Sequence, residues 1–123
     1  MPLKILIVDD SPPIRHLLRF FIEHSTDWEV CEAENGEIAI ERVVQLHPDA
    51  VILDLSMPVM NGLDAAREIS RIAPAVQMVM FTMHSSEQLR REAEAAGIKE
   101  VISKTDTIAG HLLASVRNLC DAA

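Results

Sequence analysis

Short apolar runs alternate with amphipathic helical patterns along the chain. The apolar runs predict strands at Leu3–Val8, Glu29–Ala33, Ala50–Asp54, Val76–Phe81 and Ile98–Ser103. The first, third and fourth runs are apolar without alternation, which is typical of parallel strands that are covered on both faces. The second run is more polar, so we expect it at an edge of the sheet.

Between the strands, apolar residues recur with helical spacing, and capping residues indicate where helices begin. The first two expected helices follow caps at Ser11 and Asn35, and the next two cover about Gly62–Ile72 and Ser86–Ala96. A fifth helix carries Ile108, Leu112, Val116 and Leu119. On the first helix the spacing selects Ile14, Leu17, Leu18, Phe21 and Ile22; on the second it predicts that Ile40, Val43 and Val44 face inward. Strands that alternate with helices predict βα units around one parallel sheet, an α/β fold.

Carboxylates follow two of the apolar runs. Asp9 and Asp10 follow the first run, and Asp54 ends the third. Ligands of parallel α/β sheets bind beyond the carboxyl ends of the strands, so we expect these three side chains to share one small space. Like charges at such distances repel, and a divalent cation relieves the repulsion. The pattern therefore predicts a Mg²⁺ site and phosphate chemistry.

A hydroxyl and an ammonium complete this edge of the predicted sheet. Thr82 follows the fourth run and Lys104 follows the fifth. Each residue alone has an ordinary structural explanation, such as a turn, a helix cap or a surface lysine. Together they fit phosphoryl transfer, in which a carboxylate attacks phosphorus while a cation, a hydroxyl and a lysine hold the other oxygens.

Composition limits the other classes of function. The chain has 123 residues, which is the size of one domain spanning 1–123, and a net charge of −8 that disfavours direct binding to nucleic acid or an anionic membrane. It has no apolar stretch of membrane-spanning length and no signal peptide, which predicts a cytoplasmic protein. Cys31 and Cys120 lack metal-ligand spacing and are interpreted as free thiols. The histidines lack such spacing too, although His84 lies close to Thr82 in the sequence.

Four motifs in a fixed order carry a family resemblance. They are Val8-Asp9-Asp10, then Leu53-Asp54-Leu55-Ser56-Met57-Pro58 with Asn61-Gly62, then Phe81-Thr82, and finally Ala96-Gly97 ahead of Lys104. From Leu3 to about Leu119, the chain resembles the response-regulator receiver domain of two-component signalling. The resemblance implies a doubly wound, flavodoxin-like fold with five helices and a five-stranded parallel sheet in the order 2-1-3-4-5.

The resemblance also implies roles and partners. Asp54 would be the phosphoacceptor, assisted by Thr82 and Lys104. Mg²⁺ would be held by Asp9, Asp10, Asp54 and the backbone carbonyl of Ser56, with Asp9 acting through a water. The donor would be a phosphohistidine on a sensor histidine kinase or a histidine phosphotransfer protein, and small acyl phosphates would substitute for it. Receivers often form homodimers on phosphorylation, and the sequence leaves that open.

Two positions depart from the family pattern. Val101 stands where the family usually has an aromatic residue that changes rotamer on activation, and Thr105 stands where proline usually follows the lysine. We expect phosphorylation to survive, but transmission to the face of the fourth strand, fourth helix and fifth strand to differ from that in aromatic-bearing relatives. The absence of proline favours the helix-turn-helix transcription regulators, which predicts a transcriptional output.

Three other functions remain as alternatives. The chain could act as a stand-alone receiver through protein–protein contacts. A small Mg²⁺-dependent aspartyl-phosphate phosphatase would need a second acid and a cap domain, and neither is evident. A flavin carrier would need a Ser/Thr/Gly-rich loop after the first strand and flanking aromatics, but the chain has Asp9-Asp10-Ser11-Pro12-Pro13 and no tyrosine. We therefore expect a protein that is not an enzyme beyond catalysing its own phosphorylation and dephosphorylation.

Overall fold

Five parallel strands form one sheet. The computed structural model describes residues 2–83, 85–104 and 109–121. The strands are β1 (Lys4–Val8), β2 (Glu29–Ala33), β3 (Ala50–Leu53), β4 (Gln77–Thr82) and β5 (Glu100–Ser103). Their order is β2-β1-β3-β4-β5, so the expected α/β class, the strand order and the edge position of the second strand are all confirmed.

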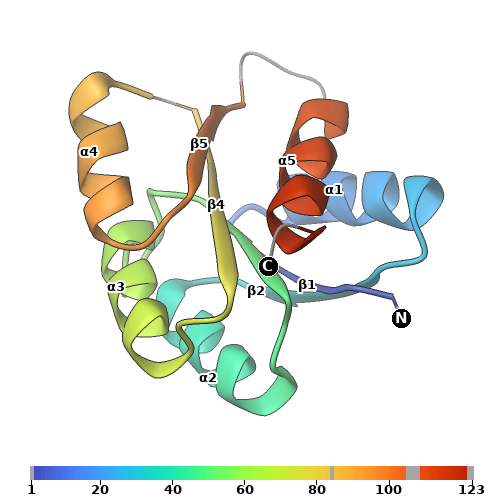
Figure 1. The fold of residues 1–123 in the computed structure, drawn as a ribbon, viewed down its shortest axis with the longest axis horizontal. Coiled ribbons are helices and arrows are strands. Elements are labelled where there is room, and N and C mark those ends of the chain that lie inside the picture. The colour runs from blue at the N-terminus through green and yellow to red at the C-terminus, as the bar shows by residue number, and fades with distance from the viewer. Residues whose placement is uncertain (1, 84, 105–108, 122–123) are drawn as a thin grey trace.

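Helices cover both faces of the sheet. They are α1 (Pro12–Ser25), α2 (Gly36–Leu46), α3 (Gly62–Ile72), α4 (Glu87–Ala95) and α5 (Ala109–Asp121). Figure 1 shows α1 and α5 on one face and α2, α3 and α4 on the other. The side chains of Ser11 and Asn35 accept hydrogen bonds from the first turns of α1 and α2, which confirms the two expected caps. Ser86 caps α4 in the same way.

The sheet divides the core into two layers, because successive side chains of a strand point to opposite faces. On the central strands β1 and β3, Leu6, Val8, Val51 and Leu53 pack toward α2, α3 and α4. Ile5, Ile7, Ala50 and Ile52 pack toward α1 and α5. Burial on both faces explains why these two runs are apolar without alternation, and it fixes the strand ends that carry the carboxylates.

Some side chains lie differently from the sequence prediction. Val43 is buried, but Val44 is 58% exposed, so its inward assignment is wrong. Adjacent residues lie about 100° apart around a helix, and α2 buries only the stripe that faces the sheet. Leu17 and Phe21 are likewise exposed on α1, where Leu18 and Ile22 form the buried stripe.

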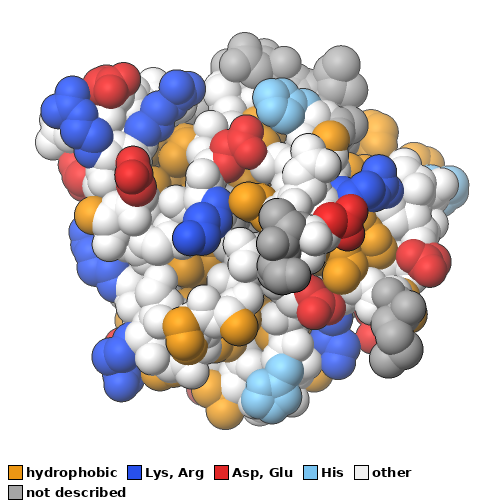
Figure 2. Space-filling view, viewed as in Figure 1, with side chains coloured by type: hydrophobic (Ala, Val, Ile, Leu, Met, Phe, Trp, Pro, Cys, Tyr) orange, Lys and Arg blue, Asp and Glu red, His pale blue; other side chains and the backbone are white. Residues whose placement is uncertain are grey.

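The outer face of α4 is charged. Figure 2 shows basic and acidic side chains mixed over this helix, at the upper left of the view. Its two buried residues, Leu89 and Ala93, lie one helical turn apart. No helix in the described part of the chain is long and apolar enough to cross a membrane. His84, Thr105 and Ile108, which the sequence singled out, lie outside the described residues.

The contrast between two neighbouring valines on α2 gives a test of the packing. Val43→Ala should lower the free energy of unfolding by about 2 kcal/mol, because it removes two buried methyl groups and leaves a cavity. Val44→Ala should change it by less than about 0.5 kcal/mol, because that side chain is already solvated. Urea unfolding followed by circular dichroism measures both, and equal losses would contradict the assignment.

Candidate functional site

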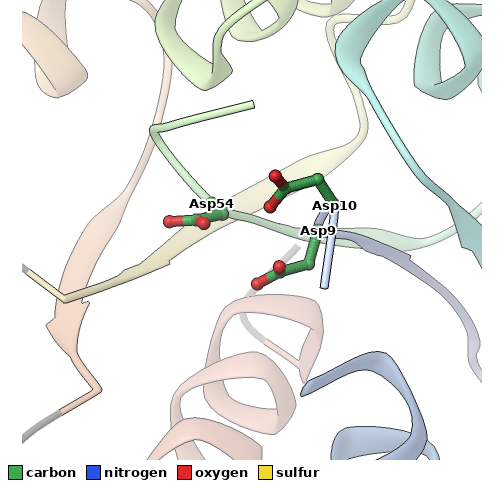
Figure 3. Close-up of side chains that lie close together, drawn as sticks. All are labelled: Asp9, Asp10 and Asp54. Carbon is green, nitrogen blue, oxygen red and sulfur yellow. The ribbon is translucent and has the colours of Figure 1, made fainter. Parts of the chain in front are cut away.

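Three carboxylates meet at the carboxyl-terminal edge of the sheet. Asp9 and Asp10 directly follow β1, and Asp54 directly follows β3. The two strands are neighbours in which Val8 pairs with Leu53, so the acids that follow lie side by side. One carboxylate oxygen from each acid lies within 4.8 Å of the others (Figure 3). Asp9 and Asp54 are buried and Asp10 is exposed, so the group opens to solvent on the side of Asp10.

Lys104 bridges the two buried acids. It directly follows β5, and its Nζ lies 2.8 Å from Asp9 Oδ2 and 3.3 Å from Asp54 Oδ2. The lysine side chain is only 10% exposed, so water screens these charges weakly. Three negative charges and one positive charge leave two negative charges unbalanced at this edge. A divalent cation would balance them.

The environment shifts the pKa of Asp54 and that of Lys104. Burial raises the pKa of Asp54, and the neighbouring Asp9 adds to that effect, while Lys104 opposes it and leaves the pKa above its ordinary value. Burial alone would lower the pKa of Lys104, but the hydrogen bond to Asp9 and the charge of Asp54 hold it above its ordinary value. The lysine therefore stays charged, and the charge of Asp54 is costly without a further cation.

Main-chain contacts fix the position of Asp54. Its N–H donates to the carbonyl of Val8 at 3.0 Å, and the N–H of Leu55 donates to Asp54 Oδ1 at 2.8 Å. The start of α3 closes over the same segment, because a Cβ added at Gly62 would lie 2.1 Å from the carbonyl oxygen of Asp54. Only glycine permits this approach, which is the physical reason for Gly62 at the start of α3.

Asp9 is held at both its main chain and its side chain. Its N–H donates to the carbonyl of Ala33 at 3.2 Å, and its own carbonyl accepts from Arg15 Nη1 at 2.7 Å. Its Oδ1 accepts from the N–H of Ser11 at 2.9 Å, while its Oδ2 is bound by Lys104. The sequence prediction did not find Arg15. Its position on the first turns of α1, five residues after Asp10, is the only signal that the sequence holds.

The remaining predicted residues also lie at this edge. Thr82 is the last residue of β4 rather than the first after it, and it is buried, with its carbonyl accepting from the N–H of Lys104 at 2.7 Å. Ser56 lies in the segment between β3 and α3. It lines an open pocket with Asp10, Leu55, Met57 and Asn61. All six predicted site residues thus come to one end of the sheet.

The oxygen atoms at this edge fit a hard cation such as Mg²⁺. Magnesium favours carboxylate and carbonyl oxygens and keeps several waters. Asp10 is exposed, and within the described ranges no hydrogen bond or ion pair engages its carboxylate, so that group is available as a ligand. Asp9, whose two oxygens already have partners, is less free to bind a cation directly.

Comparison with known proteins finds a matching family and similar chains. Residues 5–116 match the response regulator receiver domain family. The chain is 37% identical to the chemotaxis protein CheY of Thermotoga maritima over 101 residues, covering 82% of this chain and 84% of CheY. It is 38% identical to the transcriptional regulatory protein ResD of Bacillus subtilis, covering 82% of this chain but only 41% of ResD.

A solved structure extends the likeness to three dimensions. The response regulator protein TrrA of Thermotoga maritima, solved in complex with Mg²⁺-BeF, is 32% identical to this chain. The two superpose with a TM-score of 0.85, covering 97% of this chain and 99% of TrrA. The likeness therefore includes the whole sheet and the edge that carries the carboxylates.

Removing the ammonium group tests the electrostatics of the site. Lys104→Met should lower the free energy of unfolding by about 2–4 kcal/mol without metal, because two buried carboxylates lose their shared partner. Added Mg²⁺ should stabilise this variant more than the parent, since the metal would replace the missing charge. Exposed Lys99 provides the control, and Lys99→Ala should change neither quantity. Urea unfolding with EDTA or Mg²⁺ measures both; a loss below 0.5 kcal/mol would contradict the bridging role.

Proposed function

The chain belongs to the response-regulator receiver domains of two-component signalling, and we propose that Asp54 is the residue on which it receives a phosphoryl group. The observation that carries this proposal is the Lys104 ammonium between buried Asp9 and Asp54, with exposed Asp10 beside them. The donor would be a phosphohistidine on a sensor histidine kinase or a histidine phosphotransfer protein.

Each side chain has a role in the transfer. An oxygen of Asp54 attacks phosphorus, the new P–O bond forms, and the P–N bond to the donor histidine breaks as its nitrogen keeps the electron pair. The N–H of Leu55 holds Oδ1 of the attacking carboxylate, and Lys104 lies beside Oδ2. Lys104 and the hydroxyl of Thr82 would then hold the phosphoryl oxygens, because positioning and charge neutralisation supply most of the catalysis in phosphoryl transfer.

The metal would be held by the oxygens on the open side of the site. Asp10, Asp54 and the backbone carbonyl of Ser56 would bind Mg²⁺ directly, and Asp9 would act through a water because Ser11 and Lys104 engage its two oxygens. When bound, Mg²⁺ would neutralise the carboxylates and the transferred phosphoryl group. The complex of the similar TrrA with Mg²⁺-BeF supports this choice of metal. In this proposal the chain catalyses only its own phosphorylation and dephosphorylation.

The output would be read from the face of β4, α4 and β5. Val101 is half-buried on β5, pairs with Met80 of β4 and packs against the core layer that contains α4. Because valine is short and β-branched, it cannot swing between buried and exposed positions as an aromatic side chain does. Transmission from Thr82 would then either use displacement of α4 alone or be weaker than with an aromatic residue, and the smaller side chain favours weaker coupling to α4. This face would control an attached domain or a partner. The likeness to the transcriptional regulatory protein ResD favours transcription as the output.

The phosphoacceptor is tested directly by intact mass. With Mg²⁺ and a small acyl phosphate, the parent should gain one phosphoryl group that is stable in acid and labile in base. Asp54→Asn should gain none, and EDTA should slow labelling of the parent by more than about tenfold. Asp64→Asn, at an exposed position on α3, is the matched control and should label like the parent. Labelling of Asp54→Asn at the parental rate would overturn the proposal.

The role of position 101 is tested by NMR with beryllofluoride and Mg²⁺ as the phosphoryl analogue. The amide of Thr82 should shift in both the parent and Val101→Tyr, because the site itself is intact in each. Shifts along α4 should be smaller in the parent, since the side chain that would couple Thr82 to this face is missing. Shifts of equal size along α4 in the two proteins would refute the difference.

A further inference from the structure

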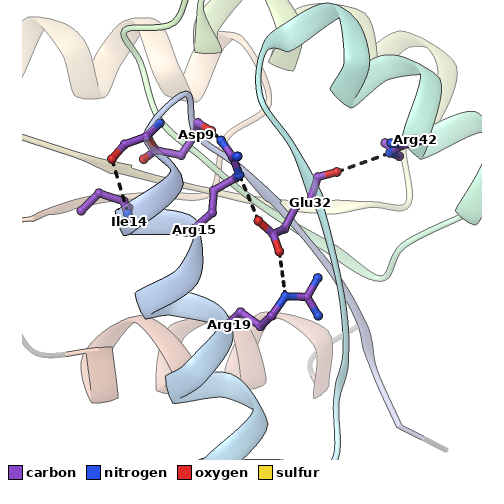
Figure 4. A network of polar contacts seen from close by, with 7 residues as sticks. Asp9, Ile14, Arg15, Arg19, Glu32 and Arg42 are labelled. Atoms are coloured by element: carbon purple, nitrogen blue, oxygen red, sulfur yellow. Dashed lines mark hydrogen bonds and ion pairs between the residues drawn. The ribbon is translucent and has the colours of Figure 1, made fainter.

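An ionic network on α1 and β2 is joined to the carboxylate site through Arg15. Arg15 Nη1 donates to the carbonyl of Asp9 at 2.7 Å, and Arg15 Nε lies 3.0 Å from Glu32 Oε1 (Figure 4). We propose that Arg15, held by Glu32, is a positioning residue that orients the peptide between Asp9 and Asp10 and so strengthens Mg²⁺ binding. This inference rests on the proposed function, which itself gives Arg15 and Glu32 no role.

The acceptor of the Arg15 hydrogen bond is the oxygen of the peptide that links the two acids. A peptide unit is planar, so fixing this oxygen also fixes the direction in which the chain enters Asp10. The N–H of Asp9 is held on the other side by the carbonyl of Ala33 at 3.2 Å. The carboxylate of Asp10 has no hydrogen bond or ion pair among the described residues, so its main chain must set its position.

Glu32 is a fixed anchor for Arg15. Its second carboxylate oxygen, Oε2, lies 2.7 Å from Arg19 Nε, so two arginines of α1 share the one acid. Its main-chain carbonyl also accepts from Arg42 Nε of α2 at 3.4 Å. Burial raises the pKa of Glu32, but the bonds from Arg19 and Arg15 outweigh that effect and hold its pKa below the ordinary value. Glu32 therefore remains charged at neutral pH.

The guanidinium group suits this role better than an ammonium. Its planar array of N–H donors allows Arg15 to bond a carboxylate through Nε and a carbonyl through Nη1 at once. The Arg15 side chain is only 17% exposed, which limits competition from water. A lysine at the same place would keep the charge but lose the fixed fork, so Arg15→Lys separates geometry from charge.

Electrostatics alone predicts the opposite change in Mg²⁺ affinity when Arg15 is replaced by an uncharged residue. Arg15 is a cation close to a cation site, so removing its charge should strengthen Mg²⁺ binding if only electrostatics mattered. Loss of positioning should weaken binding instead. The sign of the change on substitution therefore decides between the two effects.

Calorimetric titration with Mg²⁺, paired with urea unfolding, tests the inference. Arg15→Ala and Arg15→Lys should both weaken Mg²⁺ binding, by about tenfold, as is typical for residues that orient metal ligands. Arg19→Ala is the matched control, because Arg19 shares Glu32 but makes no bond to Asp9. It should lose stability, and its Mg²⁺ affinity should fall by less than in the Arg15 variants, because Arg19 reaches Asp9 only through Glu32 and Arg15.

Two further measurements keep the inference falsifiable if Arg15→Ala folds poorly. Glu32→Gln should also weaken Mg²⁺ binding. In the double variant with Arg15→Lys, Glu32→Gln should lower the Mg²⁺ affinity by less than it does in the parent, because Glu32 acts through Arg15. The amide resonance of Asp10, which lies on the oriented peptide, should shift in Arg15→Lys and shift less in Arg19→Ala.

The outcomes separate this inference from the proposed function. Unchanged or tighter Mg²⁺ binding in Arg15→Ala and Arg15→Lys, with a parent that binds Mg²⁺ and is phosphorylated on Asp54, would overturn the positioning role alone. Mg²⁺ binding that is weakened as much in Arg19→Ala as in the Arg15 variants would also overturn the positioning role, because the effect would then belong to α1 as a whole. A parent that neither binds Mg²⁺ nor accepts a phosphoryl group would overturn both.

Discussion

Repulsion among three carboxylates at one edge of the sheet is the constraint on which the rest of the site depends. Two of them are buried, and Lys104 supplies a positive charge that lies between them. Main-chain N–H groups of Ser11 and Leu55 provide further donors to Asp9 and Asp54. These contacts reduce the repulsion without removing it. The excess negative charge would favour a divalent cation, and in the proposed transfer that cation would make attack by a carboxylate on a phosphoryl group feasible.

The rigidity of the site comes from the layers beneath it. β1 and β3 are buried on both faces by two core layers, so the ends that carry Asp9 and Asp54 have little freedom to separate. The close approach of Gly62 to the carbonyl of Asp54 fixes the segment that follows β3. Close packing of this kind lets the fold hold like charges together, because relaxing their repulsion would require the core to open.

The edge strand contributes to the site in a different way. β2 lies outside β1 and carries Glu32, which gathers Arg15 and Arg19 from α1. The polarity that predicts an edge position for β2 thus also provides an ionic connection to Asp9. At the opposite edge of the sheet, β5 carries Val101, where the resemblance to receiver domains predicts an aromatic residue. The three carboxylates and Lys104 lie at the centre of the site, and Glu32 and Val101 lie on the two edge strands.

The sequence determined the strands, the helix caps and the family motifs, because apolar periodicity and capping are local properties of a chain. It also placed Asp9, Asp10, Asp54 and Lys104 at one edge, since parallel strands end on the same side of a sheet. Which side chains touch depends instead on how distant segments pack in the fold. Val44 faces solvent because the sheet lies on one side of α2 alone. Lys104 binds Asp9 as well as Asp54, and Arg15 reaches the carbonyl of Asp9, because both contacts join strands and helices that are distant in the chain.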